Sequence, residues 1–215
     1  MADCTIGVTW VPRQDEVIHT TAFTWSGAKF RIYPDGHEFP FEHEDEIINL
    51  GQQVGCFRHY YRVLKDLFMN TSTPFVGIIP DDMRLMDGAV QSACEAASAK
   101  GIGYAAMYTP AGMAAMSHRL RLGTQGWYEI KGGWGKSWGG CYVFSRAVAE
   151  RLIYHPFILS HHATYGKNQQ IDHAIPEACH RMGLKQLMHK PSLCEHVGMT
   201  STIGHVHSHR EDALK

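Results

Sequence analysis

The sequence predicts an α/β fold in which helices flank a central, mostly parallel sheet. Apolar segments alternate along the chain between short strand-like runs and longer stretches with helical spacing, and this alternation is typical of such folds. The chain has 215 residues, of which 44% are hydrophobic, so it can bury a substantial core. We therefore expect a single domain over residues 1–215.

The expected elements follow from local patterns. The run 74–79 is short, apolar and bounded by proline, as expected of a buried strand. The turn Pro34-Asp35-Gly36 ends the expected strand over residues 29–33. Strands are expected over residues 5–10, 29–33, 74–79, 103–108, 139–144 and 186–189. Helices are expected over residues 57–69, 88–97, 146–153 and 169–182, the last ended by Gly183 and open to a kink or break at Pro176. Ligands of such sheets bind at the carboxyl ends of strands.

Charge and cysteine usage narrow the class of protein. Lys and Arg number 20 and Asp and Glu 21, which excludes a uniformly basic nucleic-acid coat but allows a local basic groove. Six scattered cysteines without a C-x-x-C pair indicate reduced, mostly buried thiols. With no leader pattern and no apolar run of about 20 residues, we expect a cytoplasmic protein without a membrane partner. No obligate protein partner is indicated.

The carboxyl end of the most hydrophobic strand carries two carboxylates, Asp81 and Asp82, directly after Pro80. Carboxylates near a core need compensation, and a divalent cation with oxygen ligands supplies it. The alternative is a helix N-cap, with a helix beginning near Met83. The residues alone leave both interpretations open.

Five segments, in this order along the chain, resemble glycosyltransferases of the GT-A fold. These enzymes carry a D-x-D or E-D-D element after a central strand, followed by an acceptor-side loop, an acidic residue at a helix start and a late P-S-L…His-x-Gly…Ser stretch. The matching segments are 9–13, 78–83, 126–128 with 139–146, 170–172 and 191–201. The resemblance implies a GT-A-like, Rossmann-like domain, with the nucleotide-binding part over about 1–85 and the acceptor-side part over about 86–215.

The resemblance also implies a metal site for Mn²⁺ or Mg²⁺. Asp82 is the expected direct ligand, and His196 is expected to complete the shell. Asp81 is expected to be a ligand, a donor-sugar contact or a catalytic group. Pro80 departs from the pattern, because the family carries an acidic residue there. Without the resemblance, His196 would be an ordinary structural histidine.

A UDP-sugar donor is expected to bind after the first two strands. The resemblance places the nucleotide at the turn formed by Thr9, Trp10, Pro12 and Arg13. An aromatic face can stack on a base, and the carboxylate of Asp35 can accept from uracil or ribose. Arg58, at a helix start, is a candidate for the base or the diphosphate. For each of these residues, turn chemistry or a surface charge is the alternative.

Asp172 is the candidate base that takes a proton from the acceptor if the reaction inverts the anomeric centre. If the reaction retains the configuration, Asp172 positions the acceptor or supports the developing cation. The alternative is an acidic residue favoured by the helix dipole.

Acceptor contacts are expected from an aromatic and basic region. Residues 131–140 are rich in Gly, Trp and Lys but lack the G-x-x-x-x-G-K-[ST] spacing, so a phosphate-binding P-loop is rejected. A loop with two tryptophans suits a lid or a stacking surface, and the alternative is packing on the domain. The candidate acceptor contacts are Arg119, Arg121, Trp127, Trp134 and Trp138. A solvated loop is the alternative for the arginines.

Within the class, the chain resembles compact bacterial and phage enzymes, some of which glycosylate hydroxymethylated pyrimidines in DNA. The resemblance thus implies a hydroxymethylated base in double-stranded phage DNA as one acceptor, and a surface glycan or small sugar as another. Alternatives outside the class are a noncatalytic nucleotide- or glycan-binding module and a zinc hydrolase. The tail histidines, His205, His207 and His209, would share one face of a strand and could hold a metal, or form a polar tail.

Overall fold

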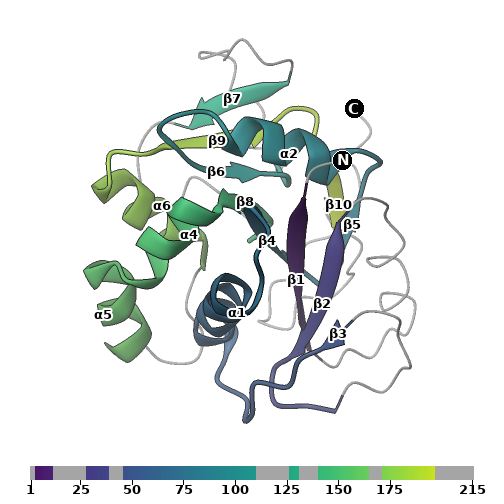
Figure 1. Cartoon of the computed structure of the whole chain (residues 1–215), viewed down its shortest axis with the longest axis vertical. Coiled ribbons are helices and arrows are strands. Elements are labelled where there is room, and N and C mark those ends of the chain that lie inside the picture. Colours follow the sequence, from purple (N-terminus) through teal and green to yellow (C-terminus); the bar gives the residue numbers. More distant parts are fainter. Residues whose placement is uncertain are drawn as a thin grey trace.

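The computed structural model describes residues 3–11, 28–38, 46–109, 126–130, 140–164 and 171–196, and these form an α/β fold, as predicted. An eight-stranded sheet runs through the molecule, and a two-stranded sheet lies at its side (Figure 1). The large sheet has the order β3 (Glu46–Ile47), β2 (Lys29–Pro34), β1 (Cys4–Trp10), β4 (Phe75–Pro80), β8 (Tyr142–Ser145), β6 (Ile102–Ala106), β9 (Lys185–His189) and β7 (Trp127–Ile130). The small sheet pairs β5 (Met83–Leu85) with β10 (Cys194–His196).

The large sheet is parallel over its first four strands and mixed beyond them. β3, β2, β1 and β4 all pair in parallel. β8 runs antiparallel to both of its neighbours, β6 and β9 are parallel, and β7 is antiparallel to β9. The carboxyl ends of β1, β2 and β4 therefore meet the amino end of β8 at one edge of the sheet.

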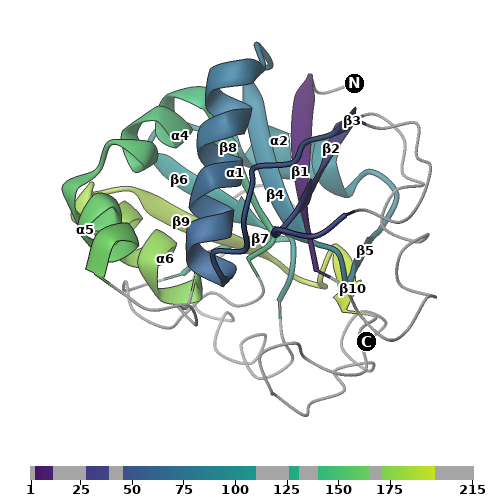
Figure 2. The ribbon, with the colours of Figure 1, turned by 90° about the horizontal axis from the view of Figure 1, so that it is seen from below.

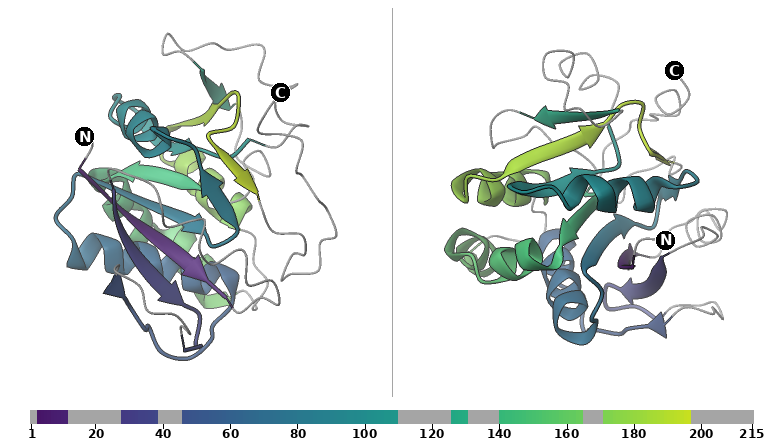
Figure 3. Two further views of the ribbon diagram at one scale, coloured as in Figure 1. Left: turned by 90° about the vertical axis from the view of Figure 1, so that its right-hand side faces the viewer. Right: turned by 45° about the horizontal axis from the view of Figure 1, so that its top comes forward.

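Helices cover both faces of the sheet (Figures 2 and 3). One face carries α1 (Cys56–Asn70), α4 (Arg146–Ile153), α5 (Pro156–Thr164) and α6 (Ile171–Arg181), and the other carries α2 (Ala89–Ala97). Alternation along β4 divides its side chains between two buried clusters: Ile78 joins the cluster of α1, and Ile79 joins that of α2.

Small residues let α1 pack closely on the sheet. The helical face predicted from Tyr60, Val63 and Leu67 is buried. A Cβ at Gly7 in β1 would lie 2.6 Å from the Val63 side chain, closer than real contacts allow. The close packing of α1 on β1 thus requires glycine at position 7, and it holds the amino end of α1 beside the sheet edge.

Some elements differ from the expectations. The chain continues helically through Pro176, because burial of Ile175 and Cys179 against the sheet offsets the lost hydrogen bond, and Gly183, at φ 67°, follows the helix end. Strands β3, β5, β7 and β10 and helix α5 were not expected, since short edge strands carry little periodic signal.

All six cysteines are free thiols and five of them are buried, which confirms the expectation from their spacing. In the described parts of the chain, no helix combines the length and apolar character needed to cross a membrane.

Candidate active site

Polar side chains gather where β1, β2 and β4 end. Because these strands are parallel neighbours, Thr9 lies opposite Pro80 and Trp10 lies opposite Pro34 in the register. The residues that follow them, including Asp35 and Asp81, therefore reach the same edge of the sheet. This is the edge at which α/β proteins bind ligands.

Asp82 and His196 form an ion-pair contact at this edge. The antiparallel pairing of β5 with β10 sets His196 opposite Met83, directly after Asp82 (Figure 2). His196 Nε2 lies 3.0 Å from Asp82 Oδ2, with the side chains 19% and 8% exposed. Two residues separated by more than 100 positions in the sequence thus present a nitrogen and an oxygen side by side.

Backbone hydrogen bonds hold the segment that carries His196. Leu193 N donates to Met107 O at 2.8 Å, and Met86 N donates to Leu193 O at 2.9 Å. Thr109 N donates to the Ser192 hydroxyl at 3.1 Å. The segment is therefore fastened both to the end of β6 and to the chain after β5, so the position of His196 is determined by regular structure.

The Asp82–His196 pair suits a divalent cation that keeps most of its coordination for a ligand. Mn²⁺ accepts both carboxylate oxygen and imidazole nitrogen, and nucleotide-bound cations commonly use only one or two protein groups. Among the described residues, no group of three or more His, Cys, Asp or Glu side chains is arranged to hold a metal. The helix-cap alternative for the acidic pair is wrong, because Met83 begins strand β5.

Asp81 has a different role from Asp82. It is 2% exposed, its backbone N donates to Thr9 O at 3.1 Å, and its Oδ2 accepts from Val11 N at 3.2 Å. The carboxylate therefore fastens the turn after β1 to the end of β4. A role of Asp81 as a ligand, a donor-sugar contact or a catalytic group stays a prediction, and the described bonds give the carboxylate a structural role as well.

The carboxylate of Asp35 likewise accepts hydrogen bonds from backbone N–H groups. It is 4% exposed, and its two oxygens accept from Val54 N at 3.0 Å and Gly55 N at 3.2 Å. These bonds fix the residues that lead into α1. Asp35 thus positions the amino end of α1 at the sheet edge, and a direct donor contact by Asp35 stays a prediction.

Cys56 follows directly on the two residues whose backbone N–H groups donate to Asp35. It is the first residue of α1 and is exposed to solvent. The protein atoms crowded around its sulfur raise the pKa of the thiol to about 12, and the negative charges of Asp172, Asp35 and Asp82 add to the effect. Three carboxylates, one in α6 and two in the turns after β2 and β4, thus act on the thiol at the start of α1. Arg58, half-buried in the same helical turn, brings a positive charge to this end.

Asp172 stands at the amino end of α6, next to the start of β8. Its Oδ1 accepts from Gly140 N at 3.2 Å and from the Tyr142 hydroxyl at 3.3 Å. Tyr142 is fully buried and Asp172 is partly exposed, so the carboxylate joins a buried strand to the partly exposed start of α6. The sequence did not indicate Tyr142 as a functional residue, because a tyrosine inside an apolar strand is expected to belong to the hydrophobic core.

Two tryptophans expected at binding surfaces are buried in the core. Trp10 and Trp127 are each 2% exposed. The Trp127 indole donates to the Ser92 hydroxyl at 3.1 Å and packs edge-on against His189. Stacking on a base or an acceptor needs an exposed ring face, so both expectations are corrected. Thr9 is half-buried and donates to Ile79 O at 3.4 Å.

The remaining candidates lie outside the described residues. They are Pro12, Arg13, Arg119, Arg121, Trp134, Trp138, His205, His207 and His209.

Acid is expected to destabilise the fold through His59, which is 4% exposed beneath this edge. Its Nε2 bonds to Tyr33 O at 2.8 Å, and its Nδ1 lies 3.6 Å from Asp35 Oδ1. Burial lowers the pKa of His59, against the opposing effect of Asp35 and the Tyr33 carbonyl. In the unfolded chain, the imidazole of His59 takes up a proton near pH 6.5, whereas in the folded protein it does so only at a lower pH. Between these two pH values the unfolded state therefore binds more protons than the folded state. Stability then falls as pH falls, by at most about 1.4 kcal/mol per pH unit.

Melting temperatures at pH 8, 7, 6 and 5 check this expectation. His59→Gln keeps an N–H for the Tyr33 carbonyl and is expected to show a shallower decline with acid. An identical decline in both proteins would place the sensitivity elsewhere, for instance at His161, whose pKa burial also lowers.

Fold and site together define an α/β chain with an acidic, histidine-containing edge at the carboxyl ends of its strands. At the level of sequence, neither a protein-family model nor a curated protein matches the chain. A solved structure with a similar fold is the crystal structure of GalNAc-T7 with UDP, GalNAc and Mn²⁺. The match has a TM-score of 0.60 at 8% sequence identity and covers 87% of this chain. This chain spans less than half of that structure's length, 42%, and the likeness shows a GT-A-like fold.

Proposed function

We propose that the chain is a metal-dependent glycosyltransferase that moves a sugar from a UDP-sugar to an acceptor hydroxyl. The observation that carries the proposal is the contact between Asp82 and His196 at the carboxyl edge of a GT-A-like sheet. The solved structure of similar fold holds UDP, GalNAc and Mn²⁺, which supports the same class of ligands here. The acidic surroundings of Cys56 favour a cation at this edge.

In the proposed mechanism, Asp82 and His196 are the residues that would hold Mn²⁺ or Mg²⁺. Such an ion, when bound, would supply Lewis-acid stabilisation of the leaving diphosphate. Backbone N–H groups at the start of α1, which Asp35 holds in place, orient an oxygen of the diphosphate. Arg58 adds a charged donor at the same end. Each of these groups acts where negative charge grows as the bond to the sugar breaks.

Asp172 acts on the acceptor side. In an inverting reaction its carboxylate takes the proton of the attacking hydroxyl, and in a retaining reaction it orients that hydroxyl. The Tyr142 hydroxyl and Gly140 N–H hold one carboxylate oxygen and restrict the rotation of the side chain. Acceptor contacts are also proposed for Arg119, Arg121, Trp134 and Trp138, which lie outside the described residues.

Two acceptor classes belong to the proposal: a hydroxymethylated pyrimidine in double-stranded DNA, and a surface glycan or small sugar. DNA binding that weakens steeply with salt distinguishes the first from the second, because phosphate contacts release counterions.

The function is tested by thermal unfolding with UDP, UDP-glucose, UDP-N-acetylgalactosamine and ADP, each with and without Mn²⁺. We expect stabilisation by the uridine compounds only when Mn²⁺ is present. A ligand at 100 times its Kd adds about 2.7 kcal/mol, equivalent to several degrees for a chain of this size. If no nucleotide shifts the transition in either condition, the proposal is wrong. Binding of UDP without release of sugar from any donor would indicate a noncatalytic nucleotide-binding module instead.

A further inference from the structure

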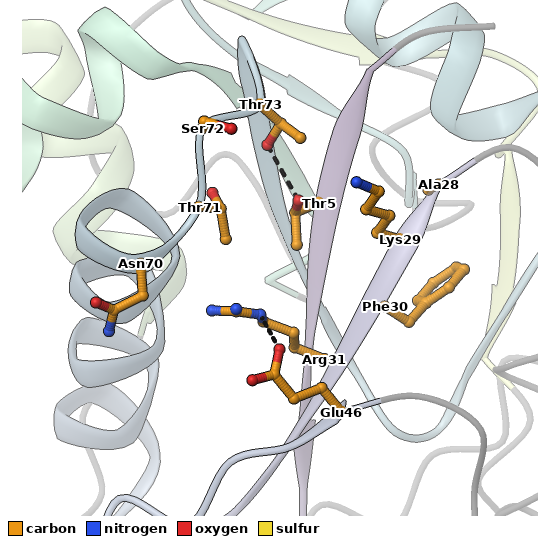
Figure 4. Close-up of a pocket in the computed structure, with 10 residues that line it drawn as sticks. All are labelled: Thr5, Ala28, Lys29, Phe30, Arg31, Glu46, Asn70, Thr71, Ser72 and Thr73. Carbon is orange, nitrogen blue, oxygen red and sulfur yellow. Dashed lines mark hydrogen bonds and ion pairs between the residues drawn. The ribbon is translucent and has the colours of Figure 1, made fainter.

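A separate cavity of about 710 Å³ lies at the other end of the parallel strands (Figure 4). Its walls come from the amino ends of β1 and β2, from β3, and from the end of α1 with the residues that follow it. Thr5 and Lys29 belong to the strand starts, whereas Asp35 and Asp82 follow strand ends. The five residue-to-residue steps along β1 from Thr5 to Trp10 span roughly 17 Å, so this cavity is distinct from the acidic edge.

The walls offer both hydrogen-bond donors and acceptors. Figure 4 shows the hydroxyls of Thr5, Thr71 and Ser72, the ammonium of Lys29 and the guanidinium of Arg31 around one space. The Thr71 hydroxyl donates to Leu67 O at 2.6 Å, so its lone pairs remain as acceptors. Lys29 and Ser72 are exposed. A ligand in this cavity would meet many polar groups of both kinds, a combination that suits a polyhydroxylated molecule.

The charges around the cavity are balanced. Arg31 Nε lies 2.8 Å from Glu46 Oε2, and Arg31 Nη1 lies 3.3 Å from Asp66 Oδ2. Lys29 is the second cation of the lining, so two cations and the two carboxylates paired with Arg31 lie at or beside the cavity. The end of α1 adds a partial negative charge, and no basic residue stands in its last turn. This balance disfavours a phosphate or sulfate and favours a neutral ligand.

The cavity is also preorganised. The Thr73 hydroxyl lies 3.1 Å from the Thr5 hydroxyl and joins the segment after α1 to β1. The Tyr33 hydroxyl donates to Asp66 Oδ2 at 2.7 Å, and this bond fixes the carboxylate that pairs with Arg31. Ligand binding therefore orders few side chains, which lowers its entropic cost. Phe30, the aromatic residue of the lining, is only 6% exposed, so stacking adds little and weak binding is expected.

We propose that this cavity binds a neutral saccharide, at a site separate from that of the sugar donor. Its volume lies within the range of roughly 300–1,000 Å³ typical of small-molecule sites, with room for a monosaccharide or a short oligosaccharide. The site depends on none of the residues assigned to metal, donor or proton transfer, and so extends beyond the proposed transferase activity.

The test uses the full-length chain, labelled with ¹⁵N, titrated with N-acetylgalactosamine and with maltotriose in the absence of Mn²⁺ and UDP. We expect chemical-shift changes at the backbone amides of Thr71 and Ser72, with a Kd of about 1–10 mM. Ser72→Trp fills the exposed side of the cavity and is expected to weaken binding at least about 10-fold. Ser98→Trp, at an exposed position after α2, is the matched control and is expected to bind normally.

Lys29→Ala is a second variant at an exposed position and is expected to weaken saccharide binding about threefold or more. The proposal is overturned if neither sugar shifts the lining amides, or if Ser72→Trp and Ser98→Trp bind alike. It is also overturned if inorganic phosphate binds the cavity in preference to the sugars and Lys29→Ala abolishes that binding. Asp82→Asn is expected to leave saccharide binding intact. The proposal of a saccharide site and the proposal of a transferase activity can therefore be refuted separately.

Discussion

Asp82→Asn is expected to abolish the Mn²⁺-dependent binding of UDP and to lower sugar transfer by about 1,000-fold or more. The substitution removes the negative charge beside His196 while keeping the size of the side chain. Stabilisation of the leaving diphosphate by a metal amounts to several kcal/mol, and each 1.36 kcal/mol corresponds to about a tenfold change in rate. Calorimetric titration of UDP with and without Mn²⁺ measures the binding, and release of UDP from the donor measures the rate.

Asp87→Asn is the matched control, because Asp87 is an exposed carboxylate five residues further on, outside the site. It is expected to bind and react as the unaltered protein does. The melting temperature of each variant without ligand separates lost folding from lost binding. Should Asp82→Asn keep Mn²⁺-dependent UDP binding within threefold, Asp82 and His196 would form a structural ion pair and the metal would lie elsewhere.

Asp172→Asn is expected to lower kcat by about 100- to 10,000-fold in an inverting reaction, while UDP affinity stays unchanged. The amide cannot accept the acceptor's proton, although it can still accept from Gly140 N and the Tyr142 hydroxyl. Tyr142→Phe removes one of these bonds and is expected to cost about 10-fold in kcat, because the carboxylate becomes less well oriented. Steady-state kinetics with the donor and a small acceptor measure both.

Glu150→Gln, at an exposed carboxylate on α4, is the control for this pair. Turnover by Asp172→Asn within threefold of the unaltered protein would remove Asp172 as a base. A modest loss confined to acceptor KM would instead favour the positioning role that belongs to a retaining reaction.

Local sequence signals identified the parts of the site that depend on single segments. The apolar run before Asp82 predicted a buried strand, and β4 confirms it. The late segment that contains His196 was expected at the metal site, and it does lie beside Asp82. The position of Asp82 follows from a strand pattern that the sequence displays directly, whereas the position of His196 was implied by the resemblance to GT-A glycosyltransferases.

Local sequence patterns could not predict the contacts between segments that are distant in the sequence. Asp35, Asp81 and Trp10 stand at the expected strand ends, yet all three are buried. Their partners come from the entry to α1 and from neighbouring strands, and no spacing within one segment reveals such pairings. Tyr142 shows the reverse case, a core-like residue whose hydroxyl reaches a carboxylate on α6.

The sequence by itself determined that the chain builds an α/β sheet and that carboxylates follow a buried strand, because periodicity and apolar runs are properties of contiguous residues. Only the tertiary structure decided which partner each polar group at the sheet edge meets. The physical reason is that a buried carboxylate is satisfied by whichever backbone N–H groups the fold brings to it. Asp35 and Asp81 meet such groups, whereas Asp82 meets the imidazole of His196.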